Sequence, residues 1–177
     1  MEIELNVKKN EVLEEVAKTS SYSGSKMTED EGAYERIFTT DADREMLERF
    51  WSESQVAVCE AMKKFLADEG ETDDGYTVSL ELSKSFDDVL QGSMEKELFS
   101  FFVMNITAKW FAFTNKKEAG DYGTAAQELL VGVRKKALYK KRPTRPTYTP
   151  GPSKTPRPPI QQEKSGKSMA VWENNRK

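Results

Sequence analysis

Apolar side chains between residues 86 and 113 recur at steps of three and four, and after Leu98 they widen to cover most sides of the segment. This spacing is typical of an α-helix, and a helix that is apolar on most sides must be covered on most sides. The pattern therefore predicts a central helix against which a helical domain packs, with Ser85 and Asp88 as its capping pattern. Its apolar members are Phe86, Val89, Leu90, Met94, Leu98, Phe101, Phe102, Val103, Ile106, Trp110 and Phe113.

Further helices are predicted before and after this segment. Thr40 can cap a helix that runs to about residue 67, and Asp41 and Asp43 suit the positive end of its dipole. A third helix is expected from Thr124 until Pro143 stops it, and a short one follows Asn10. Residues 19–31 are polar and predict a loop. The helix from Thr40 carries one apolar stripe, made of Leu47, Phe50, Trp51, Ser54, Val58, Ala61, Met62 and Phe65.

Two segments alternate apolar and polar residues, as half-buried strands do. One is residues 3–7, and the other carries Tyr76, Val78, Leu80 and Leu82. Because one strand alone is unstable, the second must pair with residues 3–7, with a second copy of itself or with another chain. We expect its four apolar residues to make an intersubunit contact. Residues 68–75 between the helix and this strand are acidic, do not match the spacing of an EF-hand, and predict a solvated turn.

Proline and charge divide the chain near residue 143. All seven prolines lie between Pro143 and Pro159. From Arg134 onward the chain has 13 basic and 2 acidic residues, a net charge of +11, whereas the preceding part has 14 basic and 28 acidic residues, a net of −14. The chain therefore predicts a domain at 1–142 and an extended, proline-rich basic tail at 143–177. Met169, Val171 and Trp172 near its end are either an anchor that docks on a partner or an accidental exposed cluster.

The composition offers little for catalysis. The chain has no histidine, and Cys59 is its one cysteine, which the helical pattern assigns to a buried, inert thiol. The acidic pair Asp87–Asp88 is better explained by capping than by acid–base chemistry. We therefore expect no enzyme activity, metal or cofactor. The acidic, mixed N-terminus and the lack of an apolar run near the ~20 residues that span a bilayer predict an intracellular protein with no membrane segment.

Residues 98–119 resemble the head–tail connector adaptors of tailed phages. In that family a bulky apolar helical run leads to a tryptophan–aromatic pair, here Trp110 and Phe111, and then to a polar turn, here 114–118. The next helix closes with a tyrosine and basic residues, which 139–142 match, and the helix at 41–66 has the expected place. Residues 1–24 and 34–51 look similar to small neck proteins of phages that infect gut Bacteroidetes. The resemblance covers about residues 40–142, and both strands and the tail are departures from it.

Together, the predicted elements give a mainly α fold: a three-helix core with one or two short strands and an extended, proline-rich basic C-terminal tail. The helical core is the part that the resemblance also implies. The resemblance further implies a noncatalytic structural subunit of the virion neck, present in the host cytoplasm during assembly. Such subunits form a homo-oligomeric, commonly dodecameric ring between the portal protein and a tail-side neck protein. The tail would dock on neighbours, and packaged DNA would lie nearby.

A nucleic-acid-binding module is the alternative. Basic residues such as Arg142, Arg145, Lys154 and Arg157 stand near Tyr139 and Tyr148. These side chains could contact phosphates and stack on bases. A basic helix end followed by a solvated linker explains the same residues, and we favour that explanation.

Overall fold

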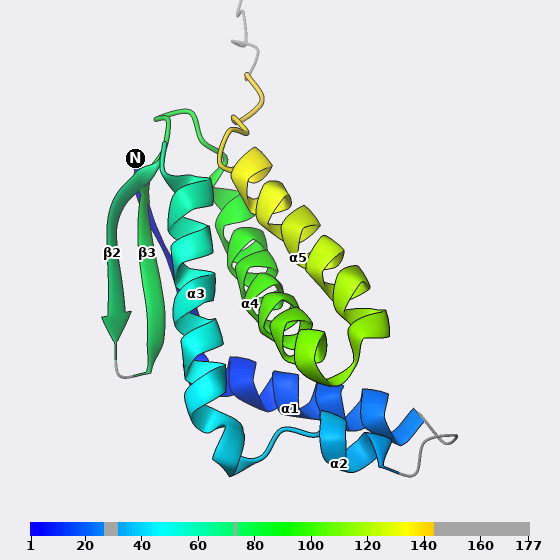
Figure 1. The fold of residues 1–177 in the computed structure, drawn as a ribbon. Helices are drawn as coiled ribbons and strands as arrows, with labels where there is room; N and C mark the ends of the chain where they lie inside the picture. The colour runs from blue at the N-terminus through cyan, green and yellow to red at the C-terminus, as the bar shows by residue number, and fades with distance from the viewer. Residues whose placement is uncertain (27–31, 73, 144–177) are drawn as a thin grey trace, which may run out of the picture. The chain divides into compact units, whose positions relative to one another are not determined.

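The computed structural model describes residues 1–26, 32–72 and 74–143 (Figure 1). The chain divides into the unit Pro143–Lys177 and the unit Met1–Arg142, which contains every helix and strand of the described residues. Its order is β1 (Glu2–Lys8), α1 (Lys9–Lys26), α2 (Ala33–Ile37), the 3₁₀ turn η1 (Asp41–Asp43), α3 (Arg44–Met62), β2 (Leu66–Thr72), β3 (Gly75–Glu81), the 3₁₀ turn η2 (Asp88–Leu90), α4 (Gln91–Thr114) and α5 (Lys116–Lys136). The described chain is mainly helical with a small sheet, and four of its helices have 18 residues or more.

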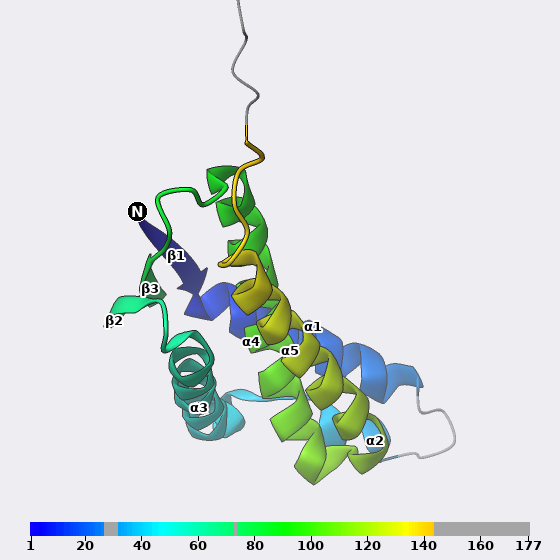
Figure 2. The same cartoon turned by 90° about the horizontal axis from the view of Figure 1, so that it is seen from above.

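Helix α4 is the central helix that the apolar pattern predicts. It packs along α5, as both views show (Figures 1 and 2), and it also contacts α1, α3 and β1. Phe101, Phe102 and Ile106 are fully buried, which confirms that the helix is covered on several sides. For two residues of its apolar set the prediction of burial is wrong: Val89 is 83% exposed in η2, and Phe113 is 64% exposed in the last turn.

Local capping differs between the two long predicted helices. The side chain and backbone of Thr40 and Asp43 form a reciprocal capping box, which confirms the predicted start near Thr40. Helix α3 ends at Met62 and not near residue 67, because the chain turns there into β2. Before α4, the carboxylate of Asp87 accepts from the Val89 amide at 3.4 Å. The predicted capping pattern of Ser85 and Asp88 is therefore wrong.

Three antiparallel strands form one sheet in the order β1-β3-β2. Leu5 lies opposite Val78, and Glu71 lies opposite Tyr76. The strand predicted at residues 3–7 is confirmed. Of the three partners considered for the second predicted strand, its partner in the structure is this strand, β1. The predicted acidic turn at 68–75 is wrong: most of it is strand β2, and only its end forms the connection to β3.

Two helices are longer than the sequence indicates. Helix α1 continues to Lys26, through the first part of the predicted loop at 19–31; residues 27–31 lie outside the described chain. Its polar residues are accommodated because Thr19 and Ser20 donate to the carbonyls of Glu15 and Ala17, at 2.8 and 2.9 Å. Helix α5 begins at Lys116 rather than Thr124. Because α1 is long and not short, the described residues form four long helices where three were predicted. Within the described ranges, no helix has the length and apolar character to cross a bilayer.

Candidate interaction surface

The two outer strands of the sheet differ in whether other elements cover their free edges. On β1, the backbone amide of Asn6 donates to the Glu95 carboxylate at 3.1 Å, and the side-chain amide of Gln91 donates to the Glu4 backbone carbonyl at 2.9 Å. Side chains from the start of α4 therefore cover that edge. Among the hydrogen bonds between described residues, none brings another element to the outer side of β2. The open edge of the sheet is β2.

Strand β2 is attached to α3 by carboxylates. Of its residues, only Leu66 is even partly buried. The Trp51 indole N–H donates to Glu71 at 3.2 Å, and Glu69 accepts from the Cys59 thiol and, at 3.1 Å, from the Tyr76 hydroxyl. These bonds replace the apolar contacts that usually hold a strand to a helix. They explain why β2 lacks the alternating apolar pattern of a half-buried strand.

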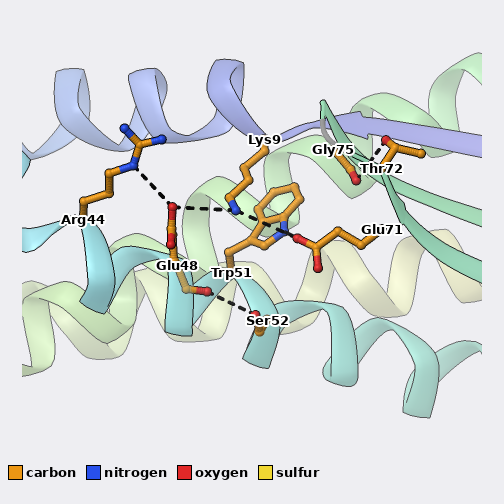
Figure 3. A network of polar contacts seen from close by, with 8 residues as sticks. All are labelled: Lys9, Arg44, Glu48, Trp51, Ser52, Glu71, Thr72 and Gly75. Carbon is orange, nitrogen blue, oxygen red and sulfur yellow. Dashed lines mark hydrogen bonds and ion pairs between the residues drawn. The ribbon is translucent and has the colours of Figure 1, made fainter.

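A chain of charges extends this attachment to the start of α1 (Figure 3). The Lys9 ammonium lies 3.9 Å from a carboxylate oxygen of Glu71 and 3.9 Å from one of Glu48. Arg44 contacts the same Glu48 oxygen at 3.3 Å. Because Arg44 and Glu48 are largely exposed, these pairs orient side chains more than they stabilise the fold. The network joins α1, α3 and β2 on one side of the domain.

A groove of about 400 Å³ lies between α3 and β2. Its apolar part includes Val56, whose side chain is unusually exposed at 59%. The groove is lined by Gln55, Val56, Cys59, Glu60, Glu69, Gly70, Glu71 and Tyr76. We call this groove, together with the outer edge of β2, the α3–β2 surface.

Two titratable groups of the α3–β2 surface, the Cys59 thiol and the Tyr76 hydroxyl, are held neutral. Burial, assisted by the hydrogen bond to Glu69, raises the pKa of the Cys59 thiol. Burial also raises the pKa of Tyr76, and its contact with Cys59 adds to the rise. A protonated thiol is a poor nucleophile. The arrangement therefore favours hydrogen bonding over covalent chemistry. The prediction of a buried thiol is correct only in part, because Cys59 is partly exposed.

A second exposed surface lies where α5 ends. Residues 85–88 and 139–141 are joined by backbone hydrogen bonds, including one of 2.8 Å from Lys141 to the Ser85 carbonyl. Three large apolar side chains on or beside these segments face solvent: Val89 at 83%, Leu138 at 61% and Tyr139 at 55% exposed. We call these three residues the junction cluster, since the described chain ends just after it.

The sequence-predicted contact residues occupy other places. Tyr76, Val78, Leu80 and Leu82 are all buried, and β3 is the middle strand with a partner on each side. The pairing with residues 3–7, one of the three partners considered, is the one present, and an intersubunit contact by these four residues stays a prediction. The alternating apolar residues indicated burial correctly, but alternation by itself does not tell a central strand from an edge strand. Within this domain the four side chains serve core packing.

The basic residues are only partly described. Arg142 is exposed, whereas Arg145, Lys154, Arg157, Met169, Val171 and Trp172 lie outside the described residues. Two neighbouring lysines already have acidic partners: Lys136 contacts Glu97 at 2.6 Å, and Lys141 contacts Asp88 at 2.9 Å. Such intramolecular pairing reduces the positive charge that α5 offers to phosphates.

The residue pattern did not predict strand β2. The one usable signal of its residues is position, because they directly precede a clear strand and a short connection that ends in Gly75. In the chain segments that the structure describes, no group of histidine, cysteine, aspartate or glutamate side chains could hold a metal ion. No protein-family model, curated protein or solved structure matches the chain.

Proposed function

We propose that this protein is a structural subunit of a phage head–tail connector. It forms a ring, dodecameric in the family it resembles, between the portal and tail-side neck proteins, and its C-terminal tail docks on neighbours. The site of action is the neck of the virion, with host cytoplasm as the place of assembly.

The observation that carries the proposal is the pair of unlike surfaces on one domain. The α3–β2 surface offers an acidic strand edge beside a groove, and the junction cluster offers exposed apolar side chains. A subunit that contacts its own kind through two different surfaces forms a head-to-tail assembly, which closes into a ring when the rotation allows. The sequence resemblance at residues 98–119 supports the same class of protein.

Charge supports a role beside DNA without a role in gripping it. The chain before Arg134 carries a net charge of −14. An acidic ring would repel the phosphates of DNA that passes through it. The basic tail is then free to contact acidic protein surfaces.

The proposal is tested on the purified full chain, with and without portal rings. We expect ring-shaped particles by negative-stain electron microscopy, or co-migration with portal rings in size-exclusion chromatography. Replacing Leu138 and Val89 of the junction cluster by serine should weaken the assembly. Serine at Tyr22, which is also exposed (62%) but lies on α1, is the matched control and should leave it intact. A chain that stays monomeric and ignores portal rings would overturn the proposal.

A further inference from the structure

We propose that the open edge of β2 binds residues 167–172 of a second copy of this chain as an added strand. The choice of a second copy rests on the proposed ring. The backbone of β2, the side-chain pattern and charge of the tail, and the length of the tail support this strand and this segment.

The backbone of β2 is suited to adding a strand. In an antiparallel ladder, alternate residues of an outer strand point their main-chain groups away from the sheet. The Glu69 amide is one of these, because it donates to the neighbouring Asp68 carboxylate at 2.9 Å. By the same alternation, the main-chain N–H and C=O groups of Glu71 also point away from the sheet. An extended peptide can therefore hydrogen-bond to the main chain of Glu71, and to the Glu69 amide by displacing the Asp68 carboxylate, without disturbing the pairing with β3.

The side-chain pattern of the tail fits the adjacent groove. Residues on one face of a strand are two positions apart, so Met169 and Val171 share a face. In a strand added to β2, that face would lie over the groove and its exposed Val56. No proline follows Pro159, so every residue from 167 to 172 keeps the backbone N–H that pairing needs.

Charge is complementary between the two segments. Strand β2 contains Asp68, Glu69 and Glu71 and no basic residue, and Glu60 also lines the groove. Residues 143–177 contain 7 basic and 2 acidic residues, a net charge of +5. Acidic side chains on an edge strand discourage pairing between two identical edges, because like charges repel. The same acidic side chains favour a basic partner, which selects the tail over a second β2.

The tail is long enough to reach another subunit. Residues 143–166 form a spacer of 24 residues, which at about 3.1 Å per residue extends to roughly 75 Å. Helix α4 has 24 residues, which at about 1.5 Å per residue is close to 36 Å long. The spacer can therefore span about twice the length of the domain's longest helix.

Disulfide trapping between two differently tagged full chains tests the inference. Both chains carry Cys59→Ser, which keeps a hydroxyl donor for Glu69 and removes the native thiol. One chain carries Val56→Cys in the groove, and the other carries Val171→Cys in the tail. After mild oxidation, with and without portal rings, we expect a mixed-tag dimer on a non-reducing gel.

Val131→Cys is the matched control for the groove position. Val131 is likewise an exposed valine on a helix, at 45% exposed, but it lies on α5. We expect at least a tenfold lower yield of mixed dimer from this chain. An equal yield from Val131→Cys, or no mixed dimer from Val56→Cys under either condition, would overturn the proposal.

A chain that carries both Val56→Cys and Val171→Cys tests the source of the added strand. A link formed only within this chain, with no mixed dimer, would overturn binding by a second copy. Imaging the same samples separates the two proposals. Rings without the Val56–Val171 link would overturn strand addition alone, whereas the absence of rings and of portal binding would count against the connector function.

Discussion

At the scale of single residues, two tryptophan indoles each donate one hydrogen bond, but their acceptors differ in exposure to water. Trp110 on α4 donates to the backbone carbonyl of Ile37 at 2.6 Å, in a bond that is buried. Trp51 on α3 donates to the carboxylate of Glu71, a side chain that is 49% exposed. A buried acceptor that loses its donor cannot turn to water, whereas an exposed one can. The two indoles should therefore differ in their importance for stability.

We expect Trp110→Phe to lower the free energy of unfolding by about 1–3 kcal/mol through the orphaned carbonyl alone, in addition to lost packing. Trp51→Phe is the matched change and should cost about 1 kcal/mol or less for its hydrogen bond. Urea unfolding followed by circular dichroism measures both. Equal losses would show that packing, and not the acceptor's access to water, decides the cost.

Cys59 offers a prediction on pH. Its folded pKa is raised by burial and by the hydrogen bond to Glu69, so folding favours the neutral thiol. This contribution to stability is full below the pKa of the unfolded thiol and is lost as the pH rises through the folded pKa. At pH 8 we expect alkylation by iodoacetamide to be slower in the folded chain than in urea. Glu69→Gln should raise the folded rate, because it removes the neighbouring negative charge; an unchanged rate would contradict this assignment.

At the scale of elements, the sheet contains two glycines with opposite constraints. A Cβ at Gly75 would lie 2.1 Å from the Val7 carbonyl oxygen on β1, whereas a Cβ at Gly70 on β2 would have no atom within 4 Å. The close approach of β1 to the start of β3 therefore requires glycine at position 75. The open side of β2 imposes no such requirement at position 70.

We expect Gly75→Ala to destabilise the domain by about 1–3 kcal/mol, because backbone must move to relieve the overlap. Gly70→Ala should be neutral or slightly stabilising, since glycine within a strand costs about 0.5–1 kcal/mol relative to alanine. Thermal unfolding of the two variants provides the comparison. A Gly75→Ala chain as stable as the parent would mean that β1 does not hold the position described.

At the scale of the whole molecule, the proposed function gives the core and the tail separate tasks. The unit Met1–Arg142 has a continuous buried core that includes residues from β1, β3, α1 and the long helices. Assembly, under the proposed function, depends on surfaces at the edge of this unit and on the tail. Changes in the tail should therefore alter assembly and leave the stability of the domain unchanged.

Trp172→Ala tests this separation. We expect weaker incorporation into rings or onto portal, with an unchanged unfolding temperature, because a buried aromatic anchor carries much of a docking segment's affinity. Tyr148→Ala removes another tail aromatic, outside residues 167–172, and serves as the control. Co-sedimentation with portal rings gives the measurement. Full incorporation of the Trp172→Ala chain would exclude an anchor role for this residue.

Elements whose signals are local could be predicted from the residue pattern alone. The apolar period over residues 86–113, the Thr40–Asp43 cap and the alternation at 3–7 and 76–82 each depend on residues close together in the chain, and the structure has a helix, a capping box and two strands there. The division near residue 143 came from proline and charge alone.

The position of the edge strand, and the places where polar segments form helix or strand, depend on contacts between distant parts of the chain. Strand β2 has no apolar pattern, because Glu69 and Glu71 are held by side chains that are distant in sequence or on another element. The end of α1 is helical where Ser23 bonds to Glu118 of α5 at 2.9 Å. Such contacts join residues far apart in the chain, so local propensity does not predict them.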